Sequence, residues 1–218
     1  LYMKKIIVIT DCAFGLPFHD PDDGLALHHL LNNRTIQVRA IVTTFGNTSE
    51  SKVYLNVKSI LKKENKDILI IRGQKQNTTS KIYNLVKNYP NKISILNLGP
   101  LTVLDKCLKD EPSIPKYWKE LVIMGGLGKI KHPLYPFIKE EFNVRKDPSA
   151  FSNVTTNTKH ILVTKEDCLK DLFTLSDIFK LPTWMRPQIF LWYLLNLLIA
   201  ENGFNPNDLT AAKVISDS

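Results

Sequence analysis

Three aspartates stand within four residues in the stretch FHDPDDGLAL, residues 18–27, directly before an apolar run. One or two acidic residues at a helix start are explained by capping and by the helix dipole. Three are harder to explain in this way, because two like charges about 4 Å apart repel by about 4 kcal/mol at an effective dielectric constant of about 20. A bound divalent cation would offset that repulsion. The stretch is therefore a candidate cation site, with helix capping as the alternative.

The elements that must position these aspartates follow an alternating pattern. Short, β-branched, nearly wholly apolar runs predict strands at 4–10, 36–44, 67–73, 92–99, 120–126 and 160–165. Runs of this kind are typical of parallel strands covered on both faces. Helical patterns lie between them at about 23–33, 50–64, 78–89, 101–109 and 147–153. The sequence therefore predicts an α/β fold, with a mostly parallel, Rossmann-like open central sheet flanked by helices.

After residue 165 the pattern becomes helical, with predicted helices at 165–179, 184–201 and 207–216. The most apolar run, IFLWYLLNLLIA at 189–200, is twelve residues long, which suits a buried core helix better than a membrane span. Repeats and linkers are not evident. We expect one domain over residues 1–218, with a helical C-terminal part from about residue 165.

Composition narrows the class of protein. A chain of 218 residues with 44% hydrophobic and 23% charged residues is typical of a single globular domain. The three cysteines are few, odd in number and far apart, which argues against a disulfide framework. Cys12 is then a buried small hydrophobe rather than a nucleophile. The apolar run after Lys4 and Lys5 is too short for the hydrophobic region of a secretory signal peptide. We therefore expect a soluble, cytoplasmic protein.

The net charge of +8 does not by itself indicate nucleic-acid binding. Much of it comes from lysines in segments such as LKKENKD and GKIKH, which are typical of solvated helix ends and loops. Nucleic-acid binders more often interleave arginine and aromatic residues along one face. We therefore expect a small-molecule ligand, no nucleic-acid partner and no membrane contact.

Polar residues recur at the ends of four predicted strands. They are Asp11 with the acidic loop, TTFGN at 43–47, LGPLT at 98–102, and MGG at 124–126. Each alone could be an ordinary turn or cap. In open α/β sheets, however, ligands bind beyond the carboxyl ends of the strands. The shared location of these four segments predicts one binding cleft.

Together these segments resemble the inosine–uridine-preferring nucleoside hydrolase family. The matching stretches occur in the family's order as DPDDGLAL (20–27), TTFGNTS (43–49), LGPLTVL (98–104), VIMGG (122–126) and EFNVRKDPSA (141–150). The resemblance covers roughly residues 4–155 well and the remainder loosely. It implies a homo-oligomeric enzyme, a dimer or tetramer, that hydrolyses the N-glycosidic bond of ribonucleosides to ribose and free base.

The resemblance also implies a tightly bound calcium ion, which takes six to eight oxygen ligands. Asp23, the main-chain oxygen of Thr102, and Asp208 in NPNDLTAA match the family's metal ligands. The residues that match its sugar-binding positions are Asp22, Asn47, Glu141 and Asn143. The resemblance implies that a water molecule, activated by the ion, attacks the anomeric carbon while a carboxylate takes its proton. For Asp208, a plain helix N-cap is the alternative.

This chain departs from the family pattern in the acidic loop. Ala13 stands where the family has an aspartate that binds the metal and acts as general base, and the residues LPFH are inserted before DPDD. Either Asp20 or Asp11 could take the place of that aspartate, and we favour Asp20 at the metal with Asp11 as a candidate base. Asp20 and Asp11 are thus the two candidate catalytic carboxylates. Alternatively, Asp11 only caps and orients the loop.

Two further departures concern the leaving base and the sugar. Asn207 stands where the family has a histidine beside the last aspartate, and asparagine cannot be a general acid. His19 in the inserted loop could compensate, or it could be exposed without a role. Lys129 replaces the asparagine expected after MGG. The alternative function is therefore a weakened relative that binds calcium and a ribosyl ligand without efficient turnover.

The sequence does not choose between purine and pyrimidine bases. Aromatic residues of the helical part are the candidates for base recognition, with core packing as the alternative for each: Trp184, Trp192, Tyr193 and Phe204.

Overall fold

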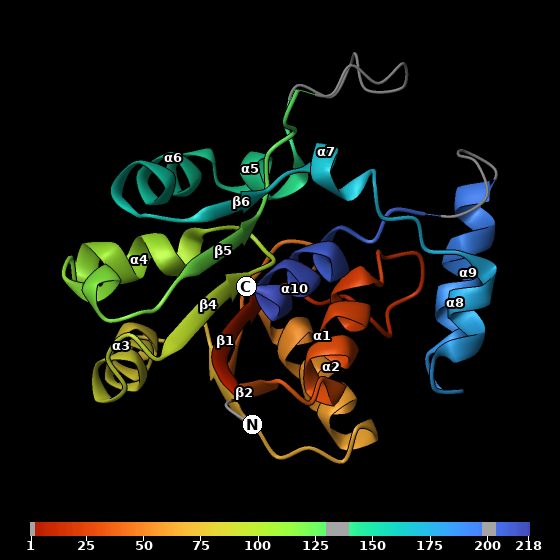
Figure 1. Ribbon diagram of the computed structural model, residues 1–218, viewed down its shortest axis with the longest axis horizontal. Coiled ribbons are helices and arrows are strands. Elements are labelled where there is room, and N and C mark those ends of the chain that lie inside the picture. The colour runs from red at the N-terminus through yellow and green to blue at the C-terminus, as the bar shows by residue number, and fades with distance from the viewer. Residues whose placement is uncertain (1–2, 130–139, 198–203) are drawn as a thin grey trace.

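The apolar runs form one parallel sheet in the computed structural model, which describes residues 3–129, 140–197 and 204–218. The strands are β1 (Lys4–Thr10), β2 (Ile36–Thr43), β3 (Leu69–Arg72), β4 (Ile93–Asn97), β5 (Leu121–Met124) and β6 (Ile161–Val163). Their order is β3-β2-β1-β4-β5-β6, and every pairing is parallel (Figure 1). The predicted fold class is confirmed, and each predicted strand lies within three residues of an observed one.

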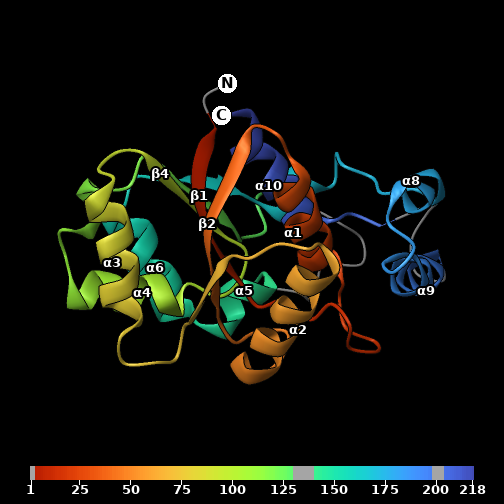
Figure 2. The ribbon, with the colours of Figure 1, turned by 90° about the horizontal axis from the view of Figure 1, so that it is seen from below.

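Helices cover both faces of this sheet. In chain order they are α1 (Asp22–Asn32), α2 (Glu50–Lys63), α3 (Thr78–Asn88), α4 (Thr102–Asp110), the 3-10 turn η1 (Ile114–Lys116), α5 (Phe142–Lys146), α6 (Pro148–Asn157), α7 (Lys165–Cys168), α8 (Leu175–Lys180), α9 (Arg186–Leu197) and α10 (Asn207–Asp217). Seen along the sheet, α3, α4 and α6 form one outer layer, and α1, α2 and α10 form the other (Figure 2).

The alternation of side chains along the strands explains the two layers. Ile6 and Val8 of β1 pack into the core under α1, α2 and α10, whereas Ile7 and Ile9 pack into the core under α3, α4 and α6. All four side chains are fully buried. Successive side chains of a strand point to opposite faces, so a strand buried on both faces must be apolar at every position.

Two helix predictions in the C-terminal part are wrong. The predicted helix 165–179 is two short helices, because Thr164 and Thr174 each begin a new capping box with Asp167 and Asp177. The predicted core helix 189–200 is largely a surface helix within its described part. Only Ile189 and Tyr193 of α9 are buried, and Phe190 and Leu194 are 42% and 43% exposed. Its last predicted residues lie outside the described ranges.

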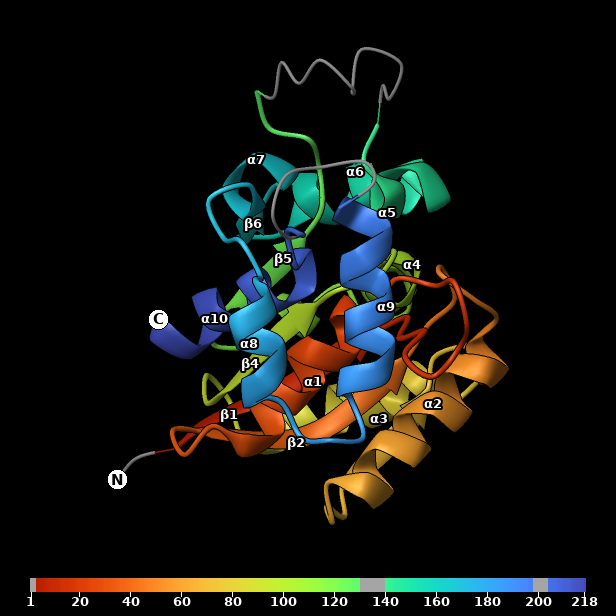
Figure 3. The ribbon, with the colours of Figure 1, turned by 90° about the vertical axis from the view of Figure 1, so that its right-hand side faces the viewer.

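Helices α8 and α9 lie side by side, outside α1 (Figure 3). They leave several large apolar side chains partly in contact with solvent, among them Phe179, Phe190, Leu191, Leu194 and Leu197. Among the residues the structure describes, no helix combines the length and the apolar character that crossing a bilayer requires.

Strand β1 is hydrogen-bonded to both β2 and β4. The chain moves outward from β1 to β2 and β3 on one side, and to β4, β5 and β6 on the other. The strand order therefore reverses between β1 and β4, and a crevice beyond the carboxyl ends of these strands is the expected ligand site of such a sheet.

Candidate active site

Three buried carboxylates meet beyond the end of β1. Asp22 and Asp23 lie in the first turn of α1, and Asp208 lies in the first turn of α10. Carboxylate oxygens of the three lie within 4.8 Å of one another, and all three residues are at most 5% exposed. The helices that carry them pack against each other. Residues 185 positions apart in the sequence are thus brought into one group that could hold a metal ion.

These carboxylates are held by other partners and do not cap their own helices. The main-chain N–H of Asp208 donates to Asp22 Oδ2 at 3.2 Å. The Thr10 hydroxyl and the Asn47 amide both donate to Asp23. The N-cap positions are prolines, Pro21 for α1 and Pro206 for α10, and neither helix has a side-chain cap hydrogen bond. The geometry therefore gives no support to the capping interpretation of Asp208.

The electrostatics of this group favour a bound cation. Burial raises the pKa of Asp23 well above its usual value, and the charges of Asp11 and Asp22 raise it further. Burial likewise raises the pKa of Asp208, with Asp22 and Asp23 as the next largest causes. Buried carboxylates that repel one another are costly unless a cation or a proton compensates them. Oxygen donors of this kind suit a hard divalent cation.

Asp11, directly after β1, is closely surrounded by the loops that carry Gly46 and Gly99. Its Oδ2 accepts a hydrogen bond from the main-chain N–H of Asn47 at 2.6 Å, whereas its buried Oδ1 has no hydrogen-bond partner among the described residues. A Cβ at Gly46 would lie 2.1 Å from Asp11 Oδ2, and one at Gly99 would lie 2.9 Å from Oδ1. Only glycine lets the two loops approach this closely. Burial raises the pKa of Asp11 to about 7, and the charges of Asp22 and Glu141 add to that effect.

A cavity of about 160 Å³ opens over the carboxylates. Eleven residues line it, and most of them stand at the ends of strands or at the starts of helices. The lining residues are Asp20, Asp22, Asn47, Leu98, Met124, Glu141, Phe142, Asn143, Lys165, Asn207 and Asp208. Six of the predicted site residues thus share one cavity: Asp20, Asp22, Asn47, Glu141, Asn143 and Asp208.

Glu141 and Asn143 form one wall of the cavity. Glu141 caps α5, because its Oε2 accepts hydrogen bonds from the main-chain N–H groups of Asn143 and Val144. The Asn143 side-chain amide donates to the main-chain oxygens of Leu98 and Met124, at the ends of β4 and β5. Both side chains are therefore fixed to the sheet, which presents them to a ligand in one orientation.

Asp20 also faces the cavity but stands outside the group of three. Its Oδ1 accepts a hydrogen bond from the main-chain N–H of Asp22 at 3.2 Å. Burial raises the pKa of Asp20, and the charge of Asp22 raises it further. The sequence had placed Asp20 at the metal and Asp22 at the sugar. The geometry instead brings Asp22 into the carboxylate group, beside Asp23 and Asp208.

The inserted loop that carries Asp20 is fixed by α9. The Gln188 side chain accepts a hydrogen bond from the Gly15 N–H at 2.7 Å and donates to the Leu16 oxygen at 3.1 Å. Phe14 packs edge-on against Trp184 at a ring-centroid distance of 5.6 Å. Sequence reasoning missed Gln188, because its partner lies more than 170 residues away and no local pattern connects the two.

Several predicted residues lie away from the cavity. The Thr102 hydroxyl donates to Asp147 at 2.6 Å, and Thr102 does not line the cavity, so its main-chain oxygen stays a predicted metal ligand. His19 is half-buried, and its ring contacts the Pro17 oxygen at 2.9 Å. The Lys129 main-chain N–H donates to Glu166 at 2.5 Å. Ala13 and Cys12 are fully buried, and burial raises the pKa of the Cys12 thiol well above its usual value.

The aromatic candidates for base recognition contribute to packing instead. Tyr193 and Phe204 are buried in the core on the α1 side of the sheet, and Trp184 and Trp192 pack against that core. None of the four is among the residues that line the cavity. Core packing, the alternative interpretation, is what the described structure shows for these side chains.

The structure adds one cavity residue that the sequence reasoning missed. Lys165, the first residue of α7, stands two residues after the end of β6 and lines the cavity. The signal that could have identified it is its position, because the four polar strand ends used to predict the cleft did not include β6. Asn207 lines the same cavity, and its Oδ1 is buried without a hydrogen-bond partner among the described residues.

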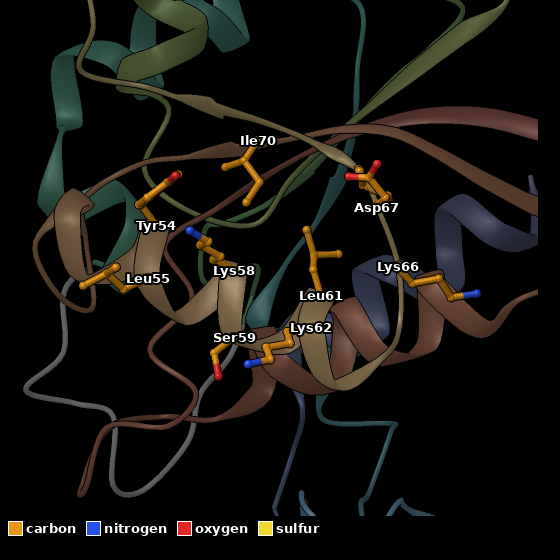
Figure 4. A pocket seen from close by; sticks show the side chains of 10 residues that line it. Tyr54, Leu55, Lys58, Ser59, Leu61, Lys62, Lys66, Asp67 and Ile70 are labelled. Carbon is orange, nitrogen blue, oxygen red and sulfur yellow. The ribbon is translucent and has the colours of Figure 1, made fainter.

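A second hollow, of about 710 Å³, lies between α2 and β3 (Figure 4). The lysines Lys58, Lys62 and Lys66 line it, with Tyr54 and Asp67. Its polar groups are mainly exposed ammonium groups, and none of the three grouped carboxylates lines it. We therefore place the candidate active site at the acidic cavity.

Solved structures share this fold at low sequence identity. A plant nucleoside hydrolase, the PpNRh1 enzyme, matches with a TM-score of 0.85 and 18% identity, over 98% of this chain and 79% of that one. A purine-preferring ribonucleoside hydrolase from Gardnerella vaginalis matches with a TM-score of 0.81 and 18% identity, over 98% and 80% of the two chains. Identities this low establish the fold alone.

Sequence comparison gives the family. A protein of Oryza sativa subsp. japonica named "Probable uridine nucleosidase 1" is 21% identical over 216 residues, covering 78% of this chain and 64% of the relative. The chain thus spans less than two thirds of that relative's length. The sequence model of the family "Inosine-uridine preferring nucleoside hydrolase" matches residues 8–217. This match extends over nearly the whole chain, including α10 with Asp208, and the chain therefore belongs to the inosine-uridine preferring nucleoside hydrolase family.

Proposed function

We propose that this protein hydrolyses the N-glycosidic bond of ribonucleosides in a calcium-dependent reaction. The observation that carries the proposal is the group formed by Asp22, Asp23 and Asp208, three buried carboxylates within 4.8 Å of one another. Two of them, Asp22 and Asp208, line a polar cavity in a chain of the nucleoside hydrolase family.

The residues present fit a calcium ion. Asp23 and Asp208 would hold it, Asp22 lies close enough to contribute an oxygen, and the Thr102 main-chain oxygen is a further predicted ligand. Calcium prefers carboxylate and carbonyl oxygens. When bound, the ion would supply positive charge that orients the ribose diol and lowers the pKa of a nearby water molecule.

The other cavity residues would bind the sugar and accept a proton. We assign the binding of ribose hydroxyls to Glu141 and Asn143, both fixed to the sheet, and to Asn47, which lines the same cavity. Asp20 lines the cavity without belonging to the group of three, so we assign to its carboxylate the acceptance of the proton from the attacking water. Asp11, with one oxygen held by the Asn47 N–H, would orient the loop that carries Asn47.

The test is the release of reducing sugar from inosine and uridine, with and without a calcium chelator. Asp23→Ala is compared with Asp67→Asn, which removes an exposed carboxylate of the α2–β3 hollow. We expect ribose release from the unsubstituted chain and from Asp67→Asn. We expect none after chelation or from Asp23→Ala. Ribose release that persists after complete removal of calcium would contradict the proposal.

A second candidate function has support in Ala13 and Asn207, which occupy positions where the resemblance implies an aspartate and a histidine. Such a chain would bind calcium and a ribosyl ligand without efficient turnover. No ribose release, together with a melting temperature that rises with calcium and rises again with ribose, would favour this candidate.

We also propose a homo-oligomer, a dimer or tetramer, as the resemblance implies. The exposed apolar side chains of α8 and α9, such as Phe179 and Leu194, would suit a contact between copies. Light scattering coupled to size-exclusion chromatography measures the mass directly, and a monomeric mass at micromolar concentration would contradict this proposal.

A further inference from the structure

Lys165 introduces a positive charge into an otherwise acidic cavity. It begins α7 at the carboxyl end of β6, and its main-chain N–H donates to the Gly126 oxygen at 2.9 Å. Its side chain lines the cavity with the carboxylates Asp20, Asp22, Glu141 and Asp208. Among the described residues, it is the one cationic side chain in that lining.

The Lys165 ammonium acts on its neighbours without forming an ion pair with them. Its charge lowers the pKa of both Asp20 and Glu141, although burial, the larger cause, raises the two values. Yet within residues 3–129, 140–197 and 204–218, no carboxylate oxygen lies within 4.0 Å of its Nζ. Other lysines of this chain, such as Lys109 and Lys213, form such pairs at 2.6 Å. Among the described residues, the ammonium of Lys165 thus has no carboxylate partner, which leaves its N–H groups able to donate to a ligand.

The proposed reaction requires a hydrogen-bond or proton donor in this cavity. As the C1′–N bond breaks, its electron pair leaves with the base, which must be stabilised by a hydrogen-bond or proton donor. An ionised carboxylate offers acceptors only, and a neutral asparagine such as Asn207 offers no acidic proton. The cavity lining contains one strong cationic donor, and that donor is Lys165.

We propose that Lys165 is the donor to the leaving base; this inference rests on the proposed function. In the step, the oxygen of water forms a bond to C1′ and its proton passes to a cavity carboxylate. The C1′–N bond breaks, and the base nitrogen keeps the electron pair. A Lys165 N–H donates to the base and transfers its proton, so that ribose and neutral base result. Lysine then regains a proton from the carboxylate through solvent, and one water molecule is consumed overall.

Leaving-group dependence separates this role from a structural one. A nucleobase such as hypoxanthine or uracil needs a donor to depart, whereas the 4-nitrophenolate of 4-nitrophenyl β-ribofuranoside departs readily without one. General acid catalysis contributes on the order of 100-fold to 10,000-fold. For Lys165→Met, which keeps an unbranched side chain of similar length, we expect kcat/KM for inosine and uridine to fall by about 100-fold or more. We expect kcat/KM for the nitrophenyl riboside to stay nearly unchanged.

Two further variants serve as controls. Lys165→Arg keeps the positive charge and the donor groups, and it should recover part of the activity on inosine. Lys170→Met removes a lysine that follows α7 and whose side chain is 79% exposed, and it should leave both substrates unaffected. Melting temperatures of all variants, with and without calcium, show whether the fold and the cation site are retained.

The outcomes separate the inference from the function on which it rests. Equal losses on inosine and on the nitrophenyl riboside would mean that Lys165 acts on the sugar, the cation or the fold, and would overturn the inference alone. Undiminished activity of Lys165→Met on both substrates would overturn it as well. If the unsubstituted chain hydrolysed neither substrate in the presence of calcium, the proposed function itself would fail.

Discussion

Individual carboxylates in this cleft differ in their surroundings, and this difference separates their roles. One cation could be shared by the carboxylates of Asp22, Asp23 and Asp208, which lie within 4.8 Å of one another. Asp20 lines the cavity outside this group, whereas Asp11 packs against Gly46 and Gly99 and accepts a hydrogen bond from the Asn47 N–H. A proton acceptor must reach the water that it activates. Of the two carboxylates that could replace the aspartate lost at Ala13, only Asp20 meets that condition by lining the cavity.

Asp20→Asn should therefore abolish turnover while cation binding survives. Asparagine keeps the shape of the side chain and its acceptor for the Asp22 N–H, but it cannot take a proton. We expect kcat to fall by about 100-fold or more. The rise in melting temperature on adding calcium should persist. Asp67→Asn, at an exposed position, is the matched control. A variant that loses its response to calcium would identify Asp20 as a metal ligand instead.

At the scale of elements, two side-chain contacts hold loops beside the cavity. The loop 13–20, which contains the inserted residues LPFH, is tied to α9 by Gln188. The loop between β2 and α2 ends at Glu50, whose carboxylate bonds to Thr43 of β2 and Arg72 of β3. Loops that carry functional groups need such rigid support, because small displacements of a reacting group are costly in rate.

Gln188→Ala should impair catalysis more than stability. It removes the two hydrogen bonds to Gly15 and Leu16, each with a net contribution of about 0.5–1.5 kcal/mol. The freed loop carries Asp20, so we expect a lower kcat/KM for nucleosides together with a small loss in melting temperature. Asn196→Ala is the matched control, because within the described residues that amide donates only to the Trp192 oxygen of α9 itself. Equal effects of the two variants on kcat/KM would refute the supporting role of Gln188.

Glu50 joins β2, β3 and α2 in one buried network. Its carboxylate accepts hydrogen bonds from the Thr43 hydroxyl at 2.5 Å and from the Arg72 guanidinium at 2.5 Å and 3.1 Å. Burial alone would raise the pKa of Glu50, but the bonds from Arg72 and Thr43 outweigh burial and lower it. A carboxylate with a lowered pKa stabilises the fold above its ordinary pKa, and that contribution disappears as the pH falls through the folded-state value.

Glu50→Gln should therefore lower the free energy of unfolding at neutral pH by about 1–3 kcal/mol. The difference from the unsubstituted chain should shrink as the pH falls below the ordinary Glu50 value of 4.5, because both chains then carry a neutral side chain. Urea unfolding at neutral and at acidic pH measures this. If the loss in the free energy of unfolding stayed constant with pH, the charge of Glu50 would contribute nothing to stability. The control is Asp67→Asn, at an exposed position, which should leave the free energy of unfolding unchanged at both pH values.

For the whole molecule, the sequence predicted the sheet well and the C-terminal part poorly. Strands buried on both faces must be apolar throughout, so their runs were visible without any tertiary information. The exposure of α9 was not visible, because an apolar helix on the surface and one in the core read alike in sequence. The predicted helix 165–179 failed because two capping boxes, at Thr164 and Thr174, interrupt it.

The candidate site shows the same division. Six predicted residues share the cavity because motifs at strand ends and helix starts are local. Lys165 and Gln188 were missed, since their roles depend on contacts across the fold. The resemblance implied that Asp23 and Asp208 share the metal, whereas it gave Asp22 to the sugar; the closeness of Asp22 to Asp208 depends on the packing of α10 against α1.

That packing would make binding of a cation depend on the whole fold. The carboxylate group joins α1 to α10, which lie 185 positions apart at Asp23 and Asp208, so an ion bound there would stabilise the molecule against global unfolding. A ligand at 100 times its dissociation constant stabilises the native state by about 2.7 kcal/mol. Without the ion, the raised pKa values of Asp23 and Asp208 mean that their ionised forms destabilise the native state.

We therefore expect the melting temperature of the chelated protein to rise as the pH falls from alkaline toward mildly acidic values, because protonation relieves the repulsion among the buried carboxylates. Added calcium should raise the melting temperature most at the alkaline end, where the carboxylates are ionised. Asp208→Asn should raise the melting temperature of the chelated protein and abolish most of the response to calcium, since it removes one repelling charge and one ligand together. Asp171→Asn, at a surface ion pair with Lys213, should leave the calcium response intact. Two results together would contradict this expectation: a lower melting temperature of chelated Asp208→Asn than of the unsubstituted chain, and an unchanged response to calcium. Asp208 would then contribute to the packing of α10 and not to cation binding.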